Sequence, residues 1–188
     1  MVNIKRLIRY EIDKRKERKQ YGSVHILASN SSVWSVPQSL CNIAYGGGLA
    51  QRDGERIRVK RLHVRIQLYR NQDPSITVRC VIFSIKKDAT PSVSELFNGG
   101  GGILMLDFRN EEFLHEYDVI RDFKMTVSDT VHSTYKDIFI KLNHLIHYNG
   151  INANDVGQGG IYITLTTDSS TFPYAQFNFA ARLIYQDD

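Results

Sequence analysis

Alternation of apolar and polar residues constrains the fold of this chain more than any other feature of its sequence. The segments 119–127, 137–146 and 160–167 all repeat with a period of two. A further segment places a run of apolar residues on one face: Phe177, Phe179, Ala181, Leu183 and Tyr185. Successive side chains of a strand point to opposite faces, so this pattern predicts strands with one buried face. The segment 76–85 is almost continuously apolar instead, which predicts a strand buried on both faces.

The alternation changes phase once, within the segment 57–69. Ile57 and Val59 alternate, and the series resumes out of phase at Leu62. A single extra residue near Lys60 would restore the register, because a shift of one residue moves every later side chain to the other face of the sheet. The sequence therefore predicts a β-bulge at this point.

Two shorter apolar segments, 24–28 and 33–36, add to these strands. We therefore expect about eight strands with turn signals between them. A short helix is predicted near 92–97. Long connections follow three of the strands, at residues 41–54, 87–117 and 147–159. This arrangement is typical of two Greek keys, so we predict one all-β domain over residues 21–188, a single jelly roll of two four-stranded antiparallel sheets.

The positive charge of the chain is concentrated at its N-terminus. Residues 1–19 carry eight basic side chains: Lys5, Arg6, Arg9, Lys14, Arg15, Lys16, Arg18 and Lys19. With three acids this segment has a charge of +5, whereas the rest of the chain has 16 basic and 17 acidic residues. A basic arm on a neutral domain is typical of proteins that hold a polyanion, and such binding is insensitive to sequence and sensitive to salt.

The arm also has an apolar stripe, which recurs at helical spacing: Ile4, Leu7, Ile8 and Ile12. We predict a basic amphipathic α-helix over residues 1–20. A helix this short is marginal alone, so the stripe needs a partner, which could be the body of the chain, a membrane surface or the same helix of neighbouring subunits. We favour self-association around a symmetry axis, because it accounts for both stripe and charge. A membrane-surface helix would carry more aromatic residues.

No pattern of catalysis is found in the sequence. Gly-x-Ser-x-Gly, His-Glu-x-x-His and Walker motifs are absent. His144 and His147 would point to opposite faces of a strand, and His144 is expected to be a core histidine. Cys41 and Cys80 form no Cys-x-x-Cys pair, which fits a reducing compartment. We therefore expect no enzyme activity and no cofactor, and the lack of a membrane-spanning apolar run argues against a membrane partner.

A second group of basic residues lies on the strand predicted at 57–69: Arg58, Lys60, Arg61, His63 and Arg65. One interpretation is a solvated face whose charges pair with acids such as Glu55. The other is a surface that contacts phosphates alongside the arm. The pattern alone leaves both open.

Five short motifs occur in a fixed order along nearly the whole chain: MVNIKRLI at 1–8, GERIRV and LHVR within 54–65, TPSVSELFN at 90–98, YNG at 148–150 and YQD at 185–187. In this order they resemble the coat proteins of the satellite tobacco necrosis virus family and the related capsid proteins of small circular single-stranded DNA viruses. The family arm has further basic residues before its helix, which this chain does not show. We therefore expect the basic strand to share in holding the genome.

The resemblance implies a viral capsid protein of the virion, assembled inside the host cell. It implies sixty copies in a small icosahedral T=1 shell, with arm helices bundled at threefold axes, around single-stranded RNA or DNA. The implied genome contacts on the inner surface are Lys5, Arg6, Arg58 and Arg121. It further implies Ca²⁺ at subunit interfaces, with carboxylate ligands at Asp13 and Asp187. The competing interpretation of Asp187 is a frayed, solvated C-terminus.

Two other functions remain open at this stage. A cellular jelly-roll module that binds a carbohydrate or another ligand through its loops would be a monomer or small oligomer, and the arm would have no role. A membrane-active protein would use residues 2–20, and the isolated arm would bind lipid vesicles.

Overall fold

The structure, a computed structural model, describes residues 18–29, 34–70, 73–88, 90–97, 108–169 and 175–188. Its strands are β1 (Lys19–Ser29), β2 (Gln38–Ser39), β3 (Arg56–Tyr69), β4 (Ser75–Ile85), β5 (Tyr117–Ser128), β6 (Ser133–His147), β7 (Ile161–Thr167) and β8 (Ala175–Asp187). Two short helical elements, α2 (Val93–Leu96) and η2 (Glu111–Phe113), lie between β4 and β5. None of the described helices is long and apolar enough to cross a membrane.

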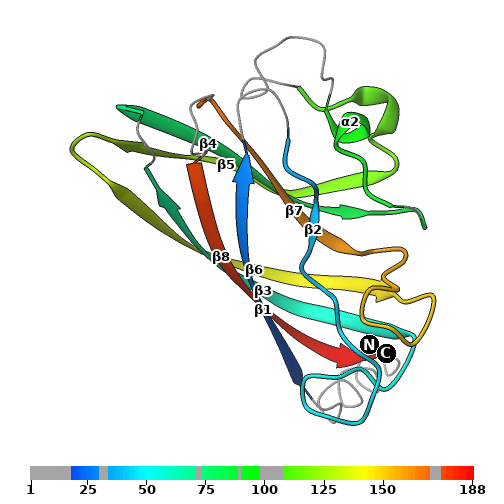
Figure 1. The fold of residues 1–188 in the computed structure, drawn as a ribbon. Coiled ribbons are helices and arrows are strands. Elements are labelled where there is room, and N and C mark those ends of the chain that lie inside the picture. The colour runs from blue at the N-terminus through cyan, green and yellow to red at the C-terminus, as the bar shows by residue number, and fades with distance from the viewer. Residues whose placement is uncertain (1–17, 30–33, 71–72, 89, 98–107, 170–174) are drawn as a thin grey trace, which may run out of the picture.

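The strands form two antiparallel sheets of four. We call the sheet with the order β1-β8-β3-β6 the front sheet and the sheet with the order β2-β7-β4-β5 the back sheet; in Figure 1 the front sheet is the lower of the two layers. The chain changes sheet at every connection except the one between β4 and β5, so strands adjacent in sequence are mostly in different layers. This is the double Greek key of a jelly roll, which confirms the predicted fold class.

The bulge predicted in the long strand is present. β3 lies inside the front sheet, where it pairs with both β6 and β8, and its register to both neighbours shifts between Val59 and Arg61. Relative to β8 the extra residue is Lys60 on β3, whereas relative to β6 the extra residue lies on β6 itself, between Lys141 and His144. Beyond Lys60, the buried series continues at Leu62 with its side chains still directed into the core.

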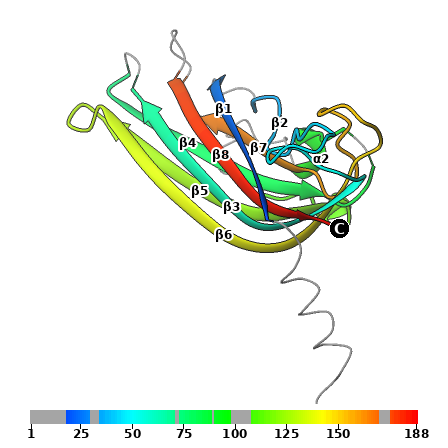
Figure 2. The same cartoon turned by 90° about the horizontal axis from the view of Figure 1, so that it is seen from below.

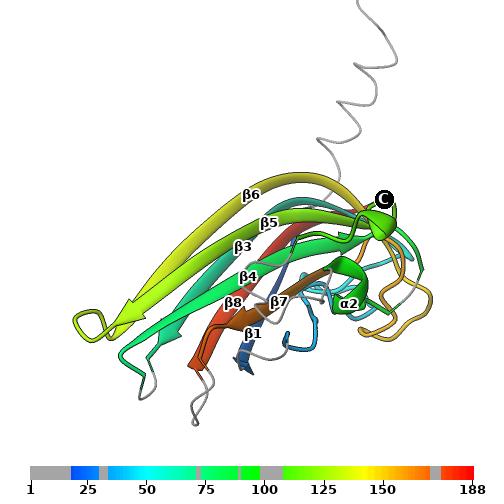
Figure 3. The same ribbon diagram turned by 90° about the horizontal axis from the view of Figure 1, so that it is seen from above.

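The main core lies between the two sheets. Val64 on β3 is fully buried opposite Ala181 of β8 and Ile138 of β6, and the inner face of β4 meets them from the back sheet. Figures 2 and 3 show the two layers and the curvature of the long strands. The period-two alternation of the sequence corresponds to this arrangement, because each strand of the front sheet buries one face.

The outer faces of the two sheets differ. One end of the back sheet is covered by the excursion between β4 and β5, where Leu96 and Phe97 pack on Phe83 and the Trp34 ring stacks on Phe97 with centroids 4.4 Å apart. β4 is therefore buried on both faces, as predicted from its apolar run. The front sheet has no such cover among the described residues, and Phe139 on its outer face is exposed.

Two predicted boundaries were wrong. β1 begins at Lys19, within the segment expected to be helical, because it pairs with β8 from Lys19 opposite Tyr185 onward. The second strand is the short β2 at Gln38–Ser39 rather than the segment 33–36. The rest of the predicted arm helix, with its apolar stripe, falls within residues 1–17, outside the described residues.

Candidate nucleic-acid interface

The outer face of the front sheet gathers basic side chains from three strands. We call it the basic face and define it by five outward-pointing cations of β3, β6 and β8: Arg58, Arg61, Arg65, Lys141 and Arg182. On each strand these residues alternate with buried apolar ones, as Arg182 does between Ala181 and Leu183. The same alternation that builds the core thus places positive charge on the opposite side of the sheet.

Part of this charge is neutralised within the chain. The Arg58 guanidinium donates to both carboxylate oxygens of Asp188, each at 3.1 Å. Asp137 is surrounded by three partners: His63 Nε2 at 2.9 Å, Arg65 Nε at 3.2 Å and the Tyr135 hydroxyl, which donates at 2.7 Å. The hydrogen bond from His63, followed by that from Tyr135, holds the pKa of Asp137 below its ordinary value.

The remaining cations of the basic face have no counter-charge among the described residues. Arg61, Lys141 and Arg182 are exposed, and none forms an ion pair with any residue that the structure describes. Arg61 lies directly opposite Lys141 in the register of β3 and β6. Like charges at directly opposed positions of a sheet destabilise it. Such a cluster favours an external anion, and a row of cations on an open surface fits a polyanion.

A shallow hollow lies within this surface. It has a volume of about 250 Å³ and is lined by residues of β1, β3 and β8, among them Val24, His63, Arg65 and Arg182. Gly22, opposite Arg182, has no side chain to fill it. On the far side of His63 the exposed ring of Phe139 stacks on the imidazole, with centroids 3.9 Å apart and an interplanar angle of 17°.

The predicted nucleic-acid contacts do not all meet on this surface. Arg58 belongs to it, and Lys60 lies half-buried in the bulge beside it. Arg121 is exposed but lies on β5, the edge strand of the back sheet. Arg18 is exposed at the start of the described residues. The other predicted arm contacts fall outside the described residues: Lys5, Arg6, Arg9, Lys14, Arg15 and Lys16.

Lys19 differs from its predicted role. Its side chain is 3% exposed, and its ammonium lies 2.7 Å from an Asp53 carboxylate oxygen and 2.9 Å from one of Asp187. Burial alone would lower the pKa of Lys19, but the hydrogen bonds and charges of the two aspartates outweigh burial and raise it. Lys19 is therefore part of an internal ion pair and is not available to a phosphate.

The cluster of Lys19, Asp53 and Asp187 includes one of the two expected calcium ligands, Asp187. Asp187 accepts a hydrogen bond from the Asp53 backbone N–H at 3.2 Å and holds the Lys19 ammonium, so one cation already lies between the carboxylates. Among the described residues no group of three or more His, Cys, Asp or Glu side chains could hold a metal. This donor set does not fit calcium within one chain. Asp187 pairs with Ile57 at the end of β8, so the C-terminus is not frayed. Asp13 lies outside the described residues.

Sequence reasoning missed three members of the site. Lys141, Phe139 and Arg182 were not singled out, although the alternation on their own strands places them opposite the buried side chains. The acids that pair with the basic strand are Asp137 and Asp188, rather than the expected Glu55. These pairings join residues distant in sequence, so they depend on strand register.

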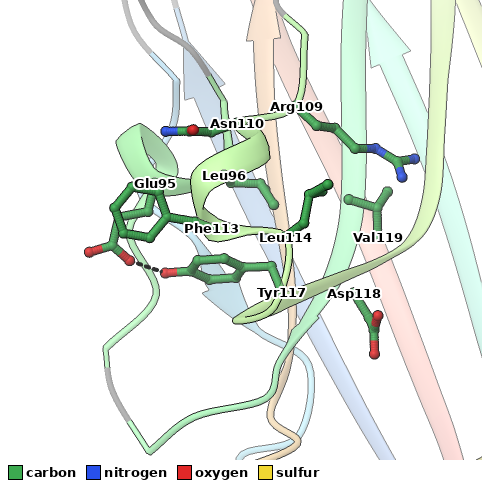
Figure 4. A pocket seen from close by; sticks show the side chains of 9 residues that line it. All are labelled: Glu95, Leu96, Arg109, Asn110, Phe113, Leu114, Tyr117, Asp118 and Val119. Carbon is green, nitrogen blue, oxygen red and sulfur yellow. Dashed lines mark hydrogen bonds between the residues drawn. The ribbon is translucent and has the colours of Figure 1, made fainter.

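A separate cavity lies where the excursion meets β5 (Figure 4). It has a volume of about 170 Å³, and Tyr117 at its rim donates a hydrogen bond to Glu95. Burial, together with this bond, raises the pKa of Tyr117 to about 12. Asp118 is paired with Lys86 at 2.8 Å. The hydrogen bond between Tyr117 and Glu95 joins β5 to the excursion that lies on the back sheet.

His144 is hydrogen-bonded but only half-buried, so it does not belong to the core as was expected. Its Nε2 lies 2.7 Å from the Gly159 carbonyl oxygen. The thiols of Cys41 and Cys80 are both free and buried, and burial raises the pKa of Cys41 to about 11. A thiol with a raised pKa is a poor nucleophile at neutral pH.

Known proteins are similar to this chain only at low identity and low TM-score. No family model matches the sequence, and no curated protein matches it. Among solved structures, one of Desmodium yellow mottle tymovirus has a TM-score of 0.44 and 10% identity, over 92% of this chain and 88% of that chain. The 60-mer BFDV capsid protein has a TM-score of 0.36 and 11% identity, over 92% of this chain and 93% of that chain. A T=1 Penaeus vannamei nodavirus structure has a TM-score of 0.42 and 12% identity, over 92% of this chain and 58% of that chain. The jelly-roll assignment itself rests on the strand order of the present chain.

Proposed function

We propose that this chain is a viral coat protein that assembles into a small closed T=1 shell and holds single-stranded RNA or DNA on its inner side. The observation that carries the proposal is the set of unpaired cations on the basic face, Arg61, Lys141 and Arg182. In such a shell the front sheet faces the genome, and the covered back sheet is turned away from it.

The basic arm supports the same proposal. It joins the body at β1, an edge strand of the front sheet, so its charges and those of the basic face can act on one polyanion. Phosphate contacts of this kind fix position without reading bases, which suits the packaging of a genome of mixed sequence. The role is structural rather than catalytic.

Exposed apolar side chains at one end of the sandwich support self-assembly. Tyr45 and Ile151 are both exposed, and they are neighbours because the Tyr45 N–H donates to the Ile151 carbonyl oxygen at 3.4 Å. Leu49 is exposed in the same loop as Tyr45. Contiguous exposed apolar groups commonly mark contacts between proteins.

Interface calcium at Asp13 and Asp187 stays a prediction of the family resemblance. It requires Asp187 to exchange Lys19 for the metal when subunits assemble. A chelator that leaves the thermal stability of purified shells unchanged would contradict it.

Electron microscopy of the purified protein, combined with the ratio of absorbance at 260 and 280 nm, tests the proposal. We expect uniform closed particles that contain nucleic acid. The triple variant R61A/K141A/R182A should package less nucleic acid. K124A should package as much as the unaltered protein, because Lys124 is an exposed cation on β5 of the back sheet. A protein that stays monomeric at all salt concentrations would contradict the proposal and favour the ligand-binding module.

A further inference from the structure

Phe139 is an exposed aromatic ring on β6, the edge strand at one side of the basic face. Its side chain is 73% exposed, although its neighbours Ile138 and Ile140 point the other way and pack in or against the core. A phenylalanine in this position contributes little to the core of its own domain. Its environment on the basic face therefore points to a ligand with both an apolar face and negative charge.

The ring is held in a fixed orientation. The imidazole of His63 covers one face of it with centroids 3.9 Å apart, and Asp137 in turn holds His63 Nε2 at 2.9 Å. A rigid ring loses little conformational freedom when a ligand stacks on it.

Unpaired cations flank the ring. Lys141 is two residues further along β6 on the same face, about 7 Å away at the rise of a strand. Arg61 lies opposite Lys141, and Arg182 lies opposite His63 on the other side of β3. A ligand that stacks on Phe139 thus has cations within reach in two directions.

We propose that Phe139 is a base-stacking residue: a nucleobase of the packaged single strand stacks on its ring while adjacent phosphates contact Lys141, Arg61 and Arg182. Every base has a π-face, so stacking of this kind tolerates any sequence. A duplex offers no free base face in its interior, so the surface selects single-stranded nucleic acid. The hollow beyond His63 would continue the path of the single-stranded nucleic acid across β3 and β8.

This inference rests on the proposed function and deepens it. The test uses the full-length protein freed of nucleic acid, with two fluorescent probes: an oligothymidylate, and an abasic oligomer of the same length and backbone. The abasic oligomer has the phosphates without the bases. Fluorescence anisotropy then separates the effect of stacking from that of charge.

We expect F139A to weaken binding of the oligothymidylate about tenfold and to leave binding of the abasic oligomer unchanged. F139W should retain binding, and its added fluorescence should be quenched by the oligothymidylate only. F108A is the matched control, because Phe108 is 83% exposed but belongs to the excursion that covers the back sheet, and its loss should change neither affinity.

Three outcomes would overturn the inference. F139A could leave both affinities unchanged, could weaken both equally, or could abolish particle assembly while leaving binding intact; the last result would identify Phe139 as a contact between copies. The variant R61A/K141A distinguishes this failure from failure of the proposed function. If R61A/K141A weakens binding of both oligomers, the basic face binds nucleic acid whatever the result for F139A. If it weakens binding of neither, the basic face does not bind nucleic acid.

Discussion

The Lys19 ammonium lies 2.9 Å from a carboxylate oxygen of Asp187, and this contact joins the first residue of β1 to the last residue of β8. Asp53 completes the cluster at 2.7 Å from the same ammonium. The point at which the basic arm leaves the body is therefore fixed by an internal ion pair.

Replacement of Lys19 by Met should destabilise the body. It removes the cation between two aspartates, and their mutual repulsion is no longer compensated. Asp53 is more than half exposed, so solvent screens part of the effect, and we expect a loss of about 1–3 kcal/mol in the free energy of unfolding. Chemical denaturation measures it, with R18M as the exposed neighbouring control. Equal stabilities of K19M and R18M would show that the ion pair contributes nothing.

The salt dependence of nucleic-acid binding should report on the basic face. Each phosphate contact with a single strand contributes about 0.7 to the slope of log K against log salt, so R61A/K141A/R182A should lower the magnitude of the slope by about 2. K124A should leave it unchanged. A triple variant with the slope of the unaltered protein would mean that these three side chains do not contact phosphates.

Replacement of Asp137 by Asn should strengthen nucleic-acid binding. It should also make the free energy of unfolding less dependent on pH in the acid range. The variant removes the negative charge that Arg65 now neutralises, so the basic face gains net positive charge. The pKa of Asp137 is lowered in the folded chain, so its stabilising contribution is fully present above the ordinary aspartate pKa. It is lost as the pH falls through the lower folded value. Denaturation midpoints measured across the acid range should fall less steeply for D137N than for the unaltered protein.

Among the arginines of the loops, Arg52 should contribute most to the free energy of unfolding. It is fully buried and donates to the carbonyl oxygens of Ile43 at 3.1 Å, Gly54 at 2.7 Å and Gly150, while its guanidinium lies 4.0 Å from the centroid of the Tyr148 ring.

Lysine cannot reproduce this planar set of donors, so R52K should lose about 2–4 kcal/mol of unfolding free energy. R56K at the exposed start of β3 is the control. A stability for R52K equal to that of R56K would contradict the structural role of Arg52.

Much of the fold follows from local patterns in the sequence. The alternation gave the long strands because each of them buries one face, and the phase change located the bulge at Lys60. The apolar run of β4 indicated burial on both faces. The short β2 could not be predicted, because two residues carry no periodicity and its position is set by pairing with β7.

The candidate site was only partly predictable. Alternation placed Arg58, Arg61 and Arg65 on one face, but their pairing depends on register with β6 and on the end of β8. Lys19 lies next to other basic residues, and composition alone assigns it to the arm. Its burial arises from strand pairing with β8, which brings Asp187 beside it.

Because the two sheets are covered unequally, the excursion and the basic face lie on opposite sides of the molecule. The excursion on the back sheet can change in length or composition without altering the register of β3, β6 and β8. A foreign peptide inserted near Phe108 would be presented on the side away from the basic face. In the proposed shell, recognition of such a peptide by antibodies and retention of nucleic acid would then involve opposite surfaces.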